Sequence, residues 1–196
     1  MLRRRHDGGF TLVELLISVT ILGILIAAIA NAMFVALHAT VSANYRLTES
    51  NDALVAATYF DDDVQGAQSV SVGTTAKCGS TAATAVVEFI GQDFADDSTL
   101  ATTTSVVTYV VRTVTGADGK TTRHLRRLVC TAATATPTYP LTPKAEITVV
   151  DRLSTSAPTV DCGGVACSAF VQVNLTVREQ SGNYVYTLTG RRRTTP

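Results

Sequence analysis

The feature that most limits how this chain folds is a long uncharged stretch near its N-terminus. From Leu15 to Tyr45 the sequence contains no Asp, Glu, Lys or Arg. A helix needs about 20 apolar residues to cross the hydrocarbon core of a bilayer, so the residues from Phe10 to Ala30 suffice. The basic residues 3–5 precede this run, which favours an N-terminus in the cytoplasm and a C-terminal part outside. The sequence therefore predicts one membrane-spanning helix followed by an extracytoplasmic region.

Two simpler interpretations of this run are a cleaved secretory signal and a plain membrane anchor. A secretory signal has an apolar core of about 7–15 residues, and the run here is about twice that long. A plain anchor fits the length but leaves Glu14 unexplained, because an ionised carboxylate within a membrane helix costs about 2–3 kcal/mol. Glu14 therefore either has a charged partner or extends its side chain to the membrane surface.

The residues around Glu14 form an ordered motif, with Gly8 and Gly9 followed by FTLVELLIS from Phe10 to Ser18. This segment resembles the processing signal of type IV prepilins and type II secretion pseudopilins. In that family a short basic leader ends in Gly, the first mature residue is apolar and the fifth is Glu. The resemblance implies cleavage between Gly9 and Phe10 by a prepilin peptidase, N-methylation of the new Phe10 amine and subunit docking through Glu14.

The same resemblance implies a structural subunit of a filament rather than an enzyme. Its implied partners are other pilin or pseudopilin subunits, the prepilin peptidase and methylase, an inner-membrane assembly platform and membrane lipid. Major pilins often carry a proline in the membrane half of the helix, but here no proline precedes Pro137. This favours a minor pilin that primes or caps a type IV pilus or a type II secretion-like filament. Residues 59–70 and the final strand before Gly190 more loosely resemble the J-type minor pseudopilins.

We expect the helix to continue beyond the membrane and to pack on a head domain. Apolar residues recur on one helical face, and acidic residues 61–63 are expected on a solvated face. The expected buried stripe consists of Leu54, Ala57, Phe60, Val64 and Ala67. The predicted organisation is a cleaved leader at 1–9, a transmembrane or filament-core helix at 10–38, an amphipathic half-helix at 39–68 and a β-rich head at 69–196.

The region after residue 68 changes to short runs rich in Thr and Val, which favour strands. The expected strands are Thr84–Ile90, Ser105–Val114, His124–Thr131, Glu146–Asp151, Ala169–Glu179 and Tyr184–Thr189. Turn signals at 115–120 and 180–183 indicate hairpins, and the Pro- and Thr-rich residues 132–143 indicate a loop. The predicted fold class is α+β, a long N-terminal helix packed on an antiparallel sheet in a pilin-like arrangement.

Four cysteines follow the apolar run, in a region that this topology exports to where disulfides persist. We favour Cys162–Cys167, which would close a turn around two glycines, together with Cys78–Cys130 across the sheet. The alternative is a four-thiolate zinc site, which fits less well because Cys78 and Cys130 are isolated in the sequence. We therefore predict two disulfides, no metal and no cofactor.

Composition and motifs give little support for catalysis or for nucleic-acid binding. The 16 Lys and Arg residues balance 16 Asp and Glu residues, so the chain has no overall positive charge. His124 has no nucleophile or second metal-binding histidine in a motif beside it. Basic residues at 123–127 and 191–193 would alternate between the two faces of their strands. The alternative function is a membrane-anchored extracytoplasmic binding module, such as a surface- or DNA-binding tip subunit.

Overall fold

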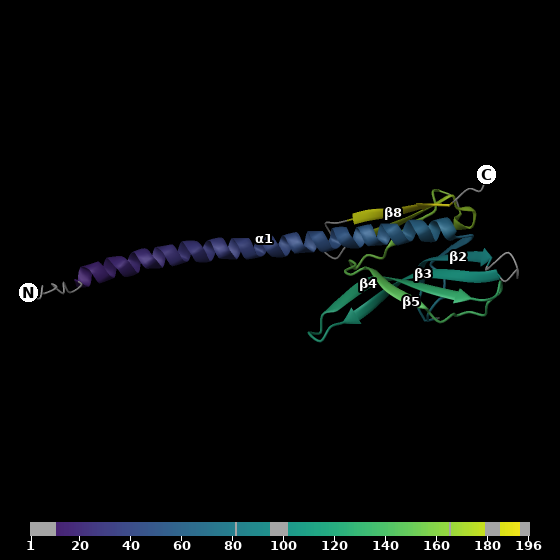
Figure 1. Cartoon of the computed structure of the whole chain (residues 1–196), viewed down its shortest axis with the longest axis horizontal. Helices are drawn as coiled ribbons and strands as arrows, with labels where there is room; N and C mark the ends of the chain where they lie inside the picture. The colour runs from purple at the N-terminus through teal and green to yellow at the C-terminus, as the bar shows by residue number, and fades with distance from the viewer. Residues whose placement is uncertain (1–10, 81, 95–101, 165, 179–184, 193–196) are drawn as a thin grey trace, which may run out of the picture. The chain divides into compact units, whose positions relative to one another are not determined.

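The computed structural model describes residues 11–80, 82–94, 102–164, 166–178 and 185–192 (Figure 1). The chain divides into two compact units, Met1–Leu47 and Thr48–Pro196, with the division inside helix α1 (Leu12–Gly66). We call them the helical unit and the head unit and describe each by itself.

The helical unit presents apolar side chains to its surroundings along the described part of its length. The side chains of residues 11–44, 46 and 47 are all exposed. Its hydroxyl groups bond back to the helix: Ser18 Oγ donates to the Glu14 carbonyl at 2.7 Å and Thr40 Oγ1 to the Ala36 carbonyl at 2.9 Å. Such bonds satisfy the hydroxyls within the helix, so this surface suits an apolar environment.

The head unit contains a five-stranded antiparallel sheet with the strand order β1-β2-β3-β4-β5. The strands are β1 (Ser69–Val72), β2 (Ala85–Phe94), β3 (Thr102–Thr115), β4 (Thr121–Ala132) and β5 (Ala145–Val150). The turn between β3 and β4 is closed by Gly116 N donating to the Lys120 carbonyl at 2.8 Å, and Gly119 adopts a φ of 74° there. The hairpin predicted around residues 115–120 is thus confirmed.

A second antiparallel sheet of the head unit has the order β6-β7-β8. It comprises β6 (Thr159–Asp161), β7 (Gln172–Arg178) and β8 (Val185–Arg191), and the short 3-10 helix η1 (Cys167–Ala169) precedes β7. The second predicted hairpin joins β7 to β8, and its turn at 180–183 lies outside the described residues. The α+β class is confirmed. The strands β1 and β6 were not predicted, because each is too short to show the two-residue alternation of a strand.

The core of the head unit lies between α1 and the sheets. Ala56, Phe60 and Val64 are fully buried on the helix, and the Phe60 ring lies edge-on to Phe89 and Tyr109 at centroid distances of 5.6 and 5.8 Å. Part of the predicted stripe is wrong, because Leu54 and Ala57 are exposed while Ala56 is buried. The buried residues Ala56, Phe60 and Val64 follow a 4-residue spacing, whereas the predicted stripe began at Leu54, two positions earlier on the helix; its members Phe60, Val64 and Ala67 are buried as predicted.

The helix approaches the smaller sheet closely at Gly190 of β8. A Cβ atom built on Gly190 would lie 2.6 Å from Val64 Cβ, which is far inside van der Waals contact. Only glycine leaves room for the Val64 side chain at this point. The contact fixes how close β8 lies to α1.

The opposite face of the five-stranded sheet carries a smaller core of Ala76, Cys78, Ala85, Val106, Val110, Leu128 and Cys130. Glu88 is fully buried on this face. Its Oε2 accepts hydrogen bonds from Lys77 N at 2.8 Å and Thr108 Oγ1 at 2.9 Å, and Lys77 Nζ lies 3.4 Å from its Oε1. Burial and the Glu88 charge raise the pKa of the neighbouring Tyr139.

Candidate functional site

The first turn of α1 contains Glu14, the acidic residue singled out by the motif. Thr11 immediately precedes the helix, and its Oγ1 accepts a hydrogen bond from Glu14 N at 3.3 Å. The same hydroxyl lies 3.5 Å from Glu14 Oε2. Thr11 and Glu14 therefore stand at the N-cap and N3 positions of a capping-box sequence, with Glu14 near the positive end of the helix dipole.

This local role of Glu14 was not predicted from the sequence, although the Thr-x-x-Glu spacing would have indicated it. The Glu14 side chain is exposed, and no ion pair with it occurs among the described residues. Gly9 and Phe10, the predicted cleavage and methylation positions, lie outside the described residues. The carboxylate is thus held at the start of the helix and is open to a partner.

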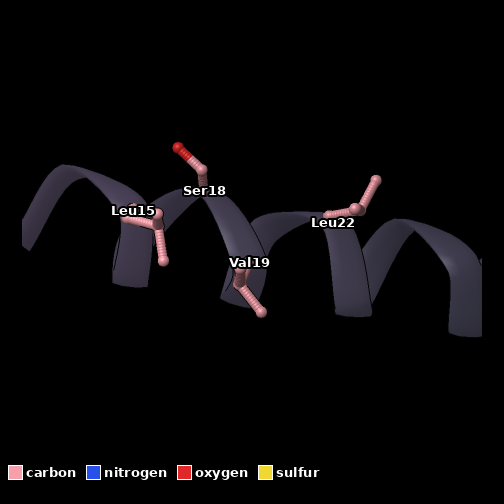
Figure 2. A pocket seen from close by; sticks show the side chains of 4 residues that line it. All are labelled: Leu15, Ser18, Val19 and Leu22. Atoms are coloured by element: carbon pink, nitrogen blue, oxygen red, sulfur yellow. The ribbon is translucent and has the colours of Figure 1, made fainter. Parts of the chain in front are cut away.

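One turn further along, α1 carries a shallow hollow lined by Leu15, Ser18, Val19 and Leu22 (Figure 2). Positions 15, 18, 19 and 22 follow the spacing that places side chains on one face of a helix. The small Ser18 side chain lies between larger apolar ones, and its hydroxyl is already bonded to Glu14 O. Large and small side chains alternate on this face, and the side chains of a second helix pack into the grooves of such a surface.

The helix is long and apolar enough to cross a membrane, by length and composition. None of its most apolar window is buried in the structure. Large exposed apolar surfaces mark contact with lipid or with another protein. The His38 ring packs edge-on against Phe34 at 4.5 Å, which places it in a local aromatic contact.

A buried ion pair joins α1 to the five-stranded sheet within the head unit. Asp63 Oδ2 accepts hydrogen bonds from Tyr109 Oη and from Arg127 Nε, both at 2.7 Å, and Arg127 Nη2 contacts Asp63 Oδ1. The Arg127 guanidinium also lies 4.9 Å from the centre of the Tyr59 ring. The expectation that residues 61–63 form a solvated face is therefore wrong for Asp63, whose side chain is only 4% exposed.

The pKa values around Asp63 follow from this geometry. Burial and the nearby Asp63 carboxylate raise the pKa of Tyr109 well above its usual value. Burial lowers the pKa of Arg127, but the hydrogen bonds and charge of Asp63 outweigh it and the net shift is upward. No sequence pattern pairs residues 63, 109 and 127, because the register of β3 against β4 pairs Tyr109 with Arg127 and the packing of α1 on the sheet brings Asp63 to them.

The structure joins the cysteines as Cys78–Cys130 and Cys162–Cys167, the two pairs that the sequence analysis favours. Gly163 and Gly164 adopt φ values of 71° and 79° within the shorter loop. The described residues include all four cysteines, and none of them is a free thiol. These sulfurs are therefore not thiolate ligands for a metal.

The basic residues considered for nucleic-acid binding have partners within the head unit. Arg123 Nη1 donates to the carbonyls of Ser154 and Thr155, and Arg126 pairs with Glu146 at 3.0 Å. His124 Nδ1 lies 3.1 Å from Asp151 Oδ1. In residues 11–80, 82–94, 102–164, 166–178 and 185–192, no group of three His, Cys, Asp or Glu residues is placed to hold a metal ion.

Comparison with known families gives a match to the prokaryotic N-terminal methylation motif over residues 4–30. The match includes Glu14 and the hollow beside it. No curated protein and no solved structure matches the chain.

The motif supports a type IV pilin-like subunit, and the family that carries this motif is of a structural, non-enzymatic kind. It implies processing by a prepilin peptidase and assembly with other pilin subunits. The motif and the apolar helix are consistent with a membrane-anchored chain whose head lies outside.

Proposed function

We propose that this chain is a minor pilin or pseudopilin that helps to initiate or cap a filament built from the inner membrane. Cleavage after Gly9 leaves a methylated Phe10, residues 10–38 serve as the transmembrane or filament-core helix, and residues 39–68 continue the helix toward the β-rich head at 69–196. The subunit resides first in the membrane with its head outside and then in the filament at the cell surface. The observation that carries the proposal is the matched motif at the start of a helix whose most apolar window is fully exposed.

Glu14 serves in this proposal as the docking group for the Phe10 amine of a neighbouring subunit. It is the only charged residue from Phe10 to Tyr45. Its side chain is exposed, and Thr11 fixes the start of the helix beside it. In an apolar bundle an ion pair between this carboxylate and an amine would leave neither charge uncompensated.

The capping contact requires a test that separates it from the docking role. Glu14→Gln keeps a residue that suits the N3 position but removes the charge, whereas Glu14→Val removes both. Breaking a buried ion pair costs about 3–5 kcal/mol, which is at least about a hundredfold in binding. We expect both variants to be processed and membrane-resident, and both to be lost from sheared filaments, with Glu14→Asp intermediate.

The measurement combines mass spectrometry of the mature N-terminus with co-fractionation of each variant with filaments. Glu49→Gln, the same substitution elsewhere on α1, is the control and should assemble normally. A chain that keeps Met1 would contradict the proposed class. Normal incorporation of Glu14→Gln together with loss of Glu14→Val would instead assign Glu14 to helix capping alone.

A further inference from the structure

The connection between β4 and β5, residues 133–144, has an unusual composition. It contains Thr134, Thr136, Thr138 and Thr142 together with Pro137, Pro140 and Pro143, and its only charged residue is the terminal Lys144. Proline has no N–H and restricts the preceding residue to extended conformations. In the structure this segment is irregular, with bends at residues 133–136 and 139–140 and an isolated β-bridge between Leu141 and Cys78.

The threonine hydroxyls of this loop face solvent. All four threonines are exposed, and the hydroxyls of Thr136, Thr138 and Thr142 have no hydrogen-bond partner among the described residues. The hydroxyls of some other threonines in the head unit are hydrogen-bonded: Thr176 and Thr187 bond each other at 3.0 Å, and Thr108 donates to Glu88. The loop hydroxyls are therefore accessible for a covalent modification, whereas a hydrogen-bonded hydroxyl would first have to lose its partner.

The loop is also held in place at its base. Leu141 N donates to the Lys77 carbonyl at 2.8 Å, and Gly79 N donates to the Leu141 carbonyl at 2.9 Å. The Cys78–Cys130 disulfide joins the segment that contains Lys77 and Gly79 to β4. Thr104 Oγ1 donates to the Thr134 carbonyl at 2.6 Å. A bulky hydrophilic group on the loop would therefore project outward without disturbing the core.

We infer that Thr136, Thr138 and Thr142 are acceptor sites for O-linked glycosylation, an inference that rests on the proposed export of the head. Threonine- and proline-rich exposed segments suit this modification, since a glycan is bulky and needs a surface position. Thr Oγ1 attacks the anomeric carbon of a lipid-linked sugar phosphate, and the new O–C bond forms as the bond from that carbon to the phosphate oxygen breaks. The phosphate departs with the electron pair, and the hydroxyl proton passes to a base of the transferase.

The test uses the full chain purified from its own host's membranes and filaments. After reduction, trypsin releases the loop in one peptide, residues 128–144, because Arg127 and Lys144 flank it. We expect this peptide to carry added masses of whole sugar residues, localised to the three threonines by fragmentation. Thr136→Ala/Thr138→Ala/Thr142→Ala should lose the added mass completely. The control Thr113→Ala/Thr115→Ala, in the exposed end of β3, should keep it.

The outcomes separate this inference from the proposed function. An unmodified loop in a chain with a methylated Phe10 overturns the glycosylation and leaves the pilin-like function intact. An added phosphate in place of sugar also overturns it. An unmodified loop in a chain that retains Met1 overturns both, whereas a glycosylated loop on such a chain supports the inference and contradicts the function.

Discussion

The substitution Asp63→Asn tests whether the buried ion pair holds the helix to the sheet in the head unit. Asp63 lies on α1 and accepts hydrogen bonds from Tyr109 of β3 and Arg127 of β4. The asparagine side chain has nearly the same shape but no charge. Its amide nitrogen donates hydrogen bonds, so the asparagine side chain cannot accept all three hydrogen bonds from the Tyr109 hydroxyl and the two Arg127 nitrogens.

The expected loss in the free energy of unfolding is about 3 kcal/mol. Removing one partner of a buried ion pair typically costs about 3–5 kcal/mol, because it leaves the other charge uncompensated. The Arg127 side chain is 15% exposed, so water partly compensates it and the lower end applies. Since small domains have about 5–15 kcal/mol of stability, this loss is a large fraction of the total.

The assay is urea unfolding of the full chain in detergent, followed by far-UV circular dichroism because the chain has no tryptophan. Asp62→Asn is the matched control, since Asp62 is an exposed neighbour on the same helix and should change stability by less than about 0.5 kcal/mol. Combining Asp63→Asn with Arg127→Met should cost less than the sum of the two single changes by about 1 kcal/mol or more. Equal effects of Asp63→Asn and Asp62→Asn would refute the reasoning.

Three further changes probe other contacts of the head unit by the same unfolding assay. Cys78→Ser should cost about 4 kcal/mol and Cys162→Ser about 2 kcal/mol, because the first disulfide closes the longer loop; equal losses would contradict this chain-entropy argument. Tyr109→Phe should flatten the fall in stability above pH 10. Folding raises the pKa of Tyr109, so this tyrosine stabilises the fold below its unfolded pKa of 10.0, and the stabilisation is lost as the pH rises through the folded pKa. An unchanged pH profile would count against this reasoning. Gly190→Ala should cost about 1–3 kcal/mol through overlap with Val64, and adding Val64→Ala should restore part of this if the overlap is the cause.

The helix and most strands could be predicted because each has a periodic or compositional signal of its own. The uncharged run from Leu15 to Tyr45 gave α1, and the Thr- and Val-rich runs gave six strands to within a few residues. The start of α1 carried a local signal as well, in the spacing of Thr11 and Glu14. Such features depend on residues close together in the chain, where sequence alone determines the contact.

The contacts that join distant segments could not be predicted in this way. Asp63 and Arg127 are 64 positions apart, and their contact depends on the packing of α1 against the five-stranded sheet. The buried face of α1 was predicted correctly at Phe60, Val64 and Ala67 but misplaced at its start, because Leu54 and Ala56 are both apolar and only packing decides between them. Gly190 likewise became informative only once Val64 was placed against it.

Polar contacts are distributed differently in the two units of the chain. In the head unit Asp63, Glu88 and Arg126 find partners within the chain. In the described part of the helical unit, by contrast, the side chains are exposed and mostly apolar, and Glu14 has no ion pair. A surface of this kind is unfavourable in water and is stabilised by lipid before assembly or by neighbouring helices after it. In the proposed assembly, exchanging lipid for helices would change the apolar contacts little, so the Glu14 carboxylate is the group whose surroundings would change most.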